Sequence, residues 1–260
     1  MLATDALVIR SVKYGEHDVL LTLLTADRGQ MFVCAKGGRS LKSEQLALSQ
    51  LFTYANMEIY EKNGRFWLKG GSVIQSFYKI SDHIESLAVA SYMAETVRDF
   101  TAEGEPCPSE LQLLLNMLYA LDKGIRNPAL IKAVWEIRLS CISGYAPDLD
   151  RCAGCGSENA GFLDLEDGHL LCQDCADRLL LRQGPDGIMV YVHQTVSVKR
   201  GALSALKYVS SASPKKLLSF ELTDPEEIAN FCAVCEAFFL YHVGHGYTSL
   251  DFCHDISHVQ

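Results

Sequence analysis

The sequence predicts an α+β protein, with a small N-terminal β-barrel followed by an α-helical domain that holds an inserted zinc ribbon. Three observations lead to this prediction. Segments rich in β-branched and aliphatic residues fill residues 1–80. Apolar residues then recur at helical spacing over most of residues 81–260, and two C-x2-C pairs interrupt this pattern within residues 150–178. We therefore expect a barrel domain at 1–80 and a helical domain at 81–260, with the zinc-binding module inserted at 150–178.

Composition and charge narrow the class of protein. Of the 260 residues, 48% are hydrophobic and 21% are charged, which is ordinary for a globular protein with two or three small domains. No apolar run is long enough to cross a bilayer and the strand pattern begins almost at once, so we expect no presequence, no membrane partner and a cytoplasmic location. The net charge of −9 argues against a nucleic-acid partner, but residues 1–80 hold ten Lys and Arg against seven Asp and Glu. A local basic patch matters more for DNA than the total charge does.

Five strands are predicted in the barrel domain. They are residues 4–13, 17–25, 30–35, 51–61 and a strand that begins at residue 65. Short turns are expected at residues 27–29 and 63–64, and the Asn-Gly pair of the second is a strong hairpin signal. One wide connection, which contains the basic residues 36–43, separates the third strand from the fourth. This arrangement favours the oligonucleotide-binding (OB) fold, a five-stranded Greek-key barrel.

Helices are predicted through most of the remaining chain. The expected helices are residues 82–102, 110–121, 128–142, 176–181, 195–209 and one that begins near Thr223 and ends at Gly244. Asp82 and Asn127 are expected to cap the first and third of them, because their side chains can accept hydrogen bonds from free backbone N–H groups. The glycines and proline of residues 184–187 are expected to end the fourth helix.

The two C-x2-C pairs, separated by sixteen residues, predict a zinc site. Zinc takes four thiolates in a tetrahedron, and each short pair can supply two of them from one tight turn. Between the pairs, residues 162–165 and 169–171 predict a β-hairpin, so the module is expected to be a zinc ribbon. Polar neighbours disfavour four inert core cysteines, and disulfides would need an oxidising compartment. The expected ligands of one structural zinc ion are Cys152, Cys155, Cys172 and Cys175.

The basic connection at residues 36–43 has two interpretations. It is either a solvated surface loop or a phosphate cradle, in which the backbone N–H groups of Gly37 and Gly38 approach the anion. The expected DNA-binding residues are Arg10, Lys13, Lys36, Arg39 and Lys42. Six nearby aromatic residues can stack on bases, but most must fill the barrel interior, so we expect only one or two to stack. These six are Tyr14, Phe32, Phe52, Tyr54, Phe66 and Trp67.

A third C-x-x-C pair, Cys232 and Cys235, lies within the last predicted helix. A redox role would place such a pair at the N-terminus of a helix, whereas this pair lies in the middle with both sulfurs on the apolar face. We expect both thiols to be buried and unreactive. The sequence contains no nucleophile elbow, metalloprotease motif or dinucleotide fingerprint, so we expect no enzymatic activity.

Together these features resemble the RecO family of bacterial DNA repair and recombination mediators. The resemblance extends over nearly the whole chain and is sharpest at residues 144–156. The residues that carry it are Arg10, Ser11, Tyr14, Gly15, Glu16, Leu24, Thr25, Gly29, Ala35, Lys36, Gly37, Lys42, Ser43, Gln50, residues 144–150 and 152–156, Gly168, Leu171, Cys172 and Cys175.

The resemblance implies an N-terminal OB domain and an α-helical domain with an inserted zinc-binding module. It also implies binding of single- and double-stranded DNA and annealing of complementary strands. It further implies that the protein acts with RecR to load RecA onto strands covered by single-strand-binding protein. The location it implies is the cytoplasm, at the nucleoid. The alternative from another class is a zinc-ribbon protein–protein adaptor whose barrel does not contact nucleic acid.

Overall fold

The structure, a computed structural model, describes residues 1–180, 182–183, 189–190 and 194–257. The chain divides into two compact units. Unit 1 consists of Met1–Ile125 and the segment from Tyr247 onward, and unit 2 is Arg126–Gly246. Buried apolar side chains are found in both units. Within the described residues, no helix is both long and apolar enough to span a bilayer.

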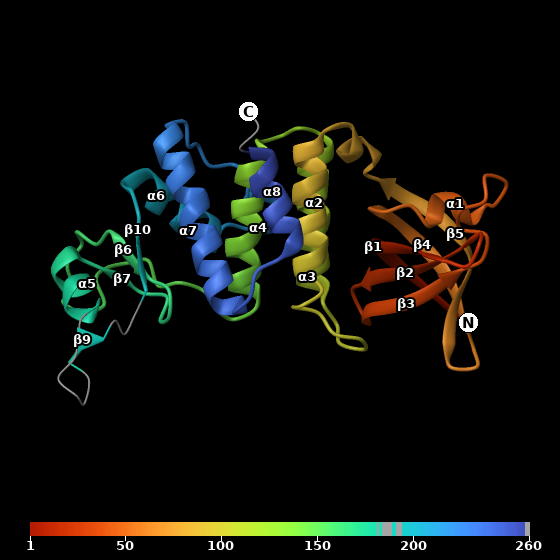
Figure 1. Ribbon diagram of the computed structural model, residues 1–260, viewed down its shortest axis with the longest axis horizontal. Coiled ribbons are helices and arrows are strands. Elements are labelled where there is room, and N and C mark those ends of the chain that lie inside the picture. The colour runs from red at the N-terminus through yellow and green to blue at the C-terminus, as the bar shows by residue number, and fades with distance from the viewer. Residues whose placement is uncertain (181, 184–188, 191–193, 258–260) are drawn as a thin grey trace. The chain divides into compact units, whose positions relative to one another are not determined.

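Unit 1 begins with a closed barrel of five strands (Figure 1). The strands are β1 (Leu2–Tyr14), β2 (Asp18–Thr25), β3 (Gly29–Ala35), β4 (Thr53–Lys62) and β5 (Arg65–Ser76). They follow the order β1-β2-β3-β5-β4, and the barrel closes where β1 pairs with β4. Strands β3 and β5 pair in parallel, whereas the other neighbours pair antiparallel. This arrangement confirms the predicted OB-type barrel.

The barrel interior is filled by apolar side chains from alternate positions of the strands. Along β4, every second residue from Thr53 to Ile59 is buried, as expected for a strand with one face toward the core. A bulge between Val8 and Arg10 shifts the register of β1. The core consists of Ala6, Val8, Val19, Leu21, Leu23, Met31, Val33, Ala35, Leu48, Ala55, Met57, Ile59 and Leu68.

The turn between β2 and β3 is bound to residues 98–107 of the same unit. The N–H of Gln30 donates to the carbonyl of Ala102 at 3.1 Å, and its side-chain amide donates to the carbonyl of Arg98 at 2.8 Å. Gly29 has a φ of +59°, and a Cβ on it would collide with the Ala102 carbonyl oxygen. These contacts fix the barrel to the segment that joins two helices of unit 1.

Unit 1 also contains three helices and two short helical turns. These elements are α1 (Gln45–Leu48), η1 (Tyr78–Asp82), α2 (Ile84–Thr96), α3 (Pro108–Asp122) and α8 (Thr248–Ser257). The prediction of a helix over residues 82–102 is wrong at both ends. Its expected cap, Asp82, belongs to η1, and α2 begins after His83. Helix α2 ends at Thr96, and tighter local turns follow, in which the N–H of Asp99 donates to the carbonyl of Thr96 at 3.0 Å.

Helix α8, which the sequence pattern did not indicate, packs against α2. The hydroxyl of Tyr247 donates to Asp99 Oδ2 at 2.7 Å, and its ring lies 5.7 Å from that of Tyr92 in an edge-on arrangement. The N–H of Ser249, in the first turn of α8, donates to Glu95 Oε2 at 3.3 Å. A segment far along the chain therefore completes the helical layer of unit 1.

Unit 2 is built on three long helices and a small sheet, and α4, α6 and α7 pack against one another (Figure 1). Its elements are α4 (Pro128–Ile142), β6 (Phe162–Asp164), β7 (Leu170–Leu171), α5 (Gln173–Leu180), β8 (Arg182–Gln183), β9 (Met189–Val190), β10 (Thr195–Ser197), α6 (Arg200–Ser211), η2 (Pro214–Lys216) and α7 (Pro225–Val243). The predicted cap of α4 is confirmed, because Asn127 accepts a hydrogen bond from the N–H of Ala129 at 2.8 Å. Helix α7 ends at Gly244, which has a φ of +78°.

The predicted helix over residues 195–209 is wrong in its first five residues. Strand β10 occupies residues 195–197 and pairs with β6, and α6 begins only at Arg200. The β-branched residues Thr195 and Val196 suit a strand once a partner strand is present. The predicted break at 184–187 lies outside the described residues, as does the last residue of the helix predicted at 176–181.

Candidate nucleic-acid interface and metal centre

Four cysteine sulfurs come together in unit 2. The Sγ atoms of Cys152, Cys155, Cys172 and Cys175 all lie within 4.8 Å of one another, and those of Cys155 and Cys172 are 3.7 Å apart. Four thiolates held tetrahedrally at Zn–S distances of about 2.3 Å would be about 3.8 Å from one another. The cluster can therefore hold a metal ion.

Two tight turns and a hairpin bring these sulfurs together. In the first turn, the N–H of Gly156 donates to the carbonyl of Cys152 at 2.8 Å, and the φ of Gly156 is +76°, which suits glycine. A Cβ on Gly154 would lie only 2.8 Å from the Sγ of Cys175, so this glycine lets the two turns approach. The β6–β7 hairpin spans the gap between the turns, and α5 begins inside the second one.

The local hydrogen bonds favour the thiolate form of one ligand. Burial raises the pKa of Cys152, but hydrogen bonds from the backbone of Cys172 and Cys155 outweigh burial and lower this pKa to about 6. The pKa of Cys175 is instead raised to about 12, first by its hydrogen bond with Cys172 and then by burial. Thiolates this close repel one another. Once one cysteine of the cluster is a thiolate, a second cysteine therefore loses its proton readily only when a cation lies between the sulfurs.

The basic connection after β3 is a series of tight turns in which the N–H groups of both glycines are already bonded. The N–H of Gly37 donates to Asp18 Oδ1 at 2.8 Å, and the N–H of Gly38 bonds to the carbonyl of Ala35 at 3.4 Å. Of the two interpretations, the phosphate cradle loses its two glycine N–H groups, because the Asp18 carboxylate and a backbone carbonyl already accept both bonds. Neither glycine N–H is therefore available to a phosphate.

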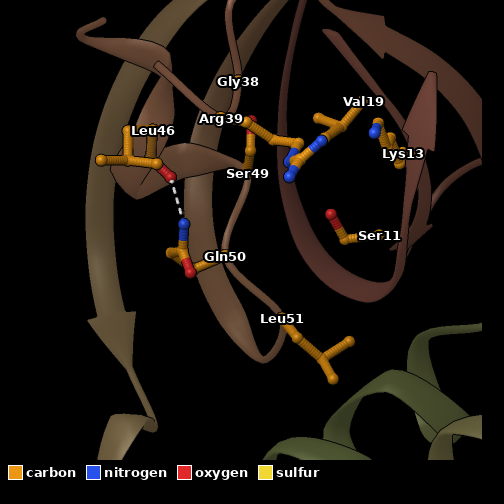
Figure 2. Close-up of a pocket in the computed structure, with 9 residues that line it drawn as sticks. All are labelled: Ser11, Lys13, Val19, Gly38, Arg39, Leu46, Ser49, Gln50 and Leu51. Carbon is orange, nitrogen blue, oxygen red and sulfur yellow. Dashed lines mark hydrogen bonds between the residues drawn. The ribbon is translucent and has the colours of Figure 1, made fainter. Parts of the chain in front are cut away.

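Two of the five expected DNA-binding residues share a surface hollow of about 520 Å³, here called the loop hollow (Figure 2). Lys13 enters it from β1 and Arg39 from the connection after β3, and the Arg39 guanidinium points toward Lys13 and Ser11. On the other side, the Gln50 amide donates to the carbonyl of Leu46 at 3.0 Å. The hollow is lined by Ser11, Lys13, Val19, Gly38, Arg39, Leu46, Ser49, Gln50 and Leu51.

Lys36 lines a different hollow of about 380 Å³ beside the β4–β5 turn, here called the hairpin hollow. Its Nζ lies over the face of the Trp67 ring, 5.2 Å from the centroid. The turn itself is tight, since Asn63 and Gly64 have φ angles of 54° and 72°, as in a type I′ hairpin. The hollow is lined by Lys36, Tyr60, Lys62, Asn63, Arg65 and Trp67.

The structure thus divides the expected residues. It brings Lys13 and Arg39 together and places Lys36 elsewhere, while Arg10 and Lys42 are exposed and line neither hollow. Lys62 and Arg65, which line the hairpin hollow, were not among the residues expected from the sequence. The available signal was their position on either side of the predicted Asn-Gly turn.

The aromatic residues divide between the barrel interior and its surface. Phe52 is 2% exposed and Phe66 packs against the barrel core, whereas Tyr14 and Phe32 are 46% and 47% exposed. These two exposed rings line a third hollow, here called the strand hollow, which Arg65 also borders. Its lining residues are Tyr14, Leu20, Phe32, Cys34, Gly64, Arg65, Phe66 and Glu103.

The third cysteine pair lies in α7. Cys235 is fully buried as expected, but the expectation is wrong in part for Cys232, which is only partly buried. Burial raises the pKa of Cys232 to about 12 and raises that of Cys235 well above its ordinary value. The Cys232 thiol donates to the carbonyl of Ala129 at 3.5 Å. Both thiols therefore resist ionisation and are weak nucleophiles.

A closed OB-type barrel, a helical region and a four-cysteine hairpin define the class of this protein: a barrel-and-helix protein with a four-cysteine module that can hold a metal ion. Residues 1–77 match the family model described as "Recombination protein O N terminal", and residues 81–251 match "Recombination protein O C terminal". The chain therefore belongs to the RecO family of DNA repair proteins.

Individual relatives agree with this assignment. The chain is 31% identical over its whole length to the DNA repair protein RecO of Acetivibrio thermocellus, covering 98% of that protein. It is 31% identical to the DNA repair protein RecO of Bacillus pumilus over 67% of this chain and 68% of the relative. The RecO protein of an Anaeromyxobacter species is 34% identical over 65% of this chain and 68% of the relative.

Proposed function

We propose that this protein is a non-enzymatic mediator of DNA repair and homologous recombination that binds single- and double-stranded DNA through its barrel and anneals complementary strands. The observation that carries the proposal is the surface of the barrel. Cationic side chains gather in two hollows there, and exposed aromatic rings line a third. Cations that neutralise phosphates and rings that stack on bases are the two components of single-strand binding sites.

The proposed DNA contacts are Arg10, Lys13, Lys36, Arg39 and Lys42, with side chains rather than backbone groups meeting the phosphates. The proposed partners are RecR, single-strand-binding protein and, indirectly, RecA, which the protein helps to load onto coated strands. Support for these partners comes from family membership and from relatives that carry the name DNA repair protein RecO.

We also propose that Cys152, Cys155, Cys172 and Cys175 bind one structural zinc ion. Four thiolates suit zinc, and a site with four protein ligands leaves no position for a catalytic water. The role proposed for the metal is therefore to hold the hairpin, with no part in chemistry.

A salt titration tests the DNA-binding proposal. If three to five phosphates are neutralised, the slope of log affinity against log salt on single strands should be about −2 to −3.5. The triple variant Lys36→Ala, Arg39→Ala, Lys42→Ala should flatten that slope and slow annealing, because the barrel loses three phosphate contacts. The fold and the metal content should stay unchanged.

A matched control removes three lysines from unit 2. The triple variant Lys207→Ala, Lys215→Ala, Lys216→Ala changes the net charge equally and should leave the slope unchanged. If the salt slope is flattened in this control variant alone, the DNA-binding surface lies on unit 2 and not on the barrel. A parent protein that binds no DNA at low salt would instead favour the zinc-ribbon adaptor.

A further inference from the structure

The hairpin hollow differs from the loop hollow in having aromatic side chains. Trp67 and Tyr60 are directly opposite each other on β5 and β4. The next residue, Leu68, lies in the barrel core, so alternation turns the Trp67 ring outward. None of the nine residues that line the loop hollow is aromatic.

Three cations line the hollow that holds this outward-facing ring. Lys36 lies over it, and Lys62 and Arg65 flank the turn beside it. The volume of about 380 Å³ is within the range of about 300–1,000 Å³ that small-molecule sites have. A ring that offers its face beside several cations suits a flat aromatic group attached to phosphates, which is a nucleotide.

We propose that the hairpin hollow binds one unpaired nucleotide of a DNA strand, with its base stacked on Trp67 and the adjacent phosphates beside Lys62 and Arg65. The inference rests on the proposed DNA-binding function and adds a base-stacking site to it. Paired bases stack on each other inside a duplex, so only an unpaired strand can offer a base face to Trp67. The hairpin hollow therefore prefers single strands, whereas the loop hollow meets phosphates of either form.

The cation already over Trp67 does not block a base. A cation–π contact at a solvent-exposed site is weaker than base stacking on an aromatic ring. An arriving base displaces the Lys36 ammonium from the ring face, and the flexible side chain is then free to meet a phosphate of the same strand.

The neighbouring strand hollow sets the path of the strand. Arg65 borders both hollows, so a strand that leaves Trp67 passes Arg65 and reaches the exposed rings of Tyr14 and Phe32. Glu103 lines this second hollow and repels phosphate. The strand therefore presents bases there and keeps its backbone toward solvent.

Intrinsic fluorescence of the full-length protein tests the proposal. The chain has two tryptophans, and Trp135 is fully buried in unit 2, so a change in emission on adding DNA reports on Trp67. A short oligothymidylate should quench this emission, and a blunt duplex of equal length should not. The variant Trp67→Phe should lose the signal. No quenching of the parent at saturating oligothymidylate would overturn the proposal.

Binding measurements on variants give an independent test. Trp67→Leu should weaken oligothymidylate binding by about tenfold, whereas Trp67→Phe should retain most of the affinity. Neither change should alter duplex binding, because the phosphate contacts remain. The double variant Lys62→Ala, Arg65→Ala should reduce the salt slope on single strands by about 1.4. Lys69→Ala is a single-charge control, since Lys69 lies on the same strand as Arg65 but pairs with Glu58 at 3.0 Å.

The failures of this inference and of the proposed function can be told apart. If the parent binds oligothymidylate but Trp67→Leu binds it equally well, the base-stacking site is wrong and DNA binding by the barrel stands. If the parent binds neither oligothymidylate nor duplex, the proposed function fails and the inference fails with it.

Discussion

At the scale of single residues, a Cβ on Gly29 would make the closest contact of any glycine in the described part of the chain. Its φ is +59°, and a Cβ would collide with the Ala102 carbonyl. We expect Gly29→Ala to lower the free energy of unfolding by about 2–4 kcal/mol in a denaturant titration. Gly15→Ala is the control, because Gly15 has a φ of +69° but open space around it, and it should cost only about 1 kcal/mol. Equal losses of unfolding free energy in the two variants would show that the close approach of Gly29 to the Ala102 carbonyl does not affect stability.

Cys232 gives a prediction about pH. Burial raises its pKa from 9.0 to about 12, so the folded state holds this proton more tightly than the unfolded state does. Stability contributed by the thiol is complete below about pH 9 and is lost as the pH rises toward 12. The parent should therefore lose more unfolding free energy than Cys232→Ala between pH 9 and pH 11.

Thiol labelling checks the same residue directly. In native protein near neutral pH, neither Cys232 nor Cys235 should react rapidly with a thiol reagent, because little thiolate is present. Rapid labelling of either one would show that the pair in α7 is reactive and accessible, contrary to this prediction.

The sequence predicted some residue positions well and others poorly. The four cysteines meet because two short spacings and one hairpin force them to, and these are local features. Lys36 and Arg39 are only three residues apart, yet they enter different hollows. The cause is the turn at Gly37, which Asp18 holds from another strand, and no local pattern in the sequence reports that contact.

At the scale of elements, α7 offers a test of helix capping. Asp224 accepts hydrogen bonds from the N–H groups of Glu226 at 2.8 Å and Glu227 at 3.1 Å. We expect Asp224→Ala to reduce the free energy of unfolding by about 1 kcal/mol, because two N–H groups lose their acceptor. Asp224→Asn keeps an acceptor and should restore most of the loss in the same titration. An equal loss in both variants would point to charge rather than to the cap.

Element boundaries were predictable where the signal is local. Asn127 and Gly244 limit their helices as expected, because a cap and a left-handed glycine act on the adjacent turn. The start of α6 was not predictable. Residues 195–197 are a strand only because β6 lies beside them, and β6 is some thirty residues away in the sequence.

At the scale of the whole molecule, metal removal should act on one unit. We expect chelation, or Cys155→Ser, to raise hydrogen exchange in residues 150–178, because the two turns lose the ion that joins them. Structural zinc contributes about 10–16 kcal/mol of apparent binding in finger peptides, but the helices of unit 2 have contacts of their own. Exchange in the barrel should stay unchanged. An equal rise in hydrogen exchange in residues 1–80 would contradict the expectation that the barrel and unit 2 have separate cores.

The division of the chain into units could be predicted only in part. The strand pattern of residues 1–80 and the helical pattern that follows indicated the fold class. The packing of α8 against α2 could not be predicted from the sequence, because the hydrogen bond from Tyr247 to Asp99 joins residues 148 positions apart. Such a contact depends on complementary side chains that have no shared local pattern.

The position of α8 also sets an order of events during synthesis. The ribosome releases the barrel and α2 long before it makes Tyr247 and Ser249, which bond to Asp99 and Glu95. Until then, the nascent chain exposes the side of α2 that α8 later covers. All of residues 126–246 must emerge before unit 1 can close. A ribosome that stalls within that stretch would release a chain with its barrel strands complete and its helical layer open to proteases and chaperones.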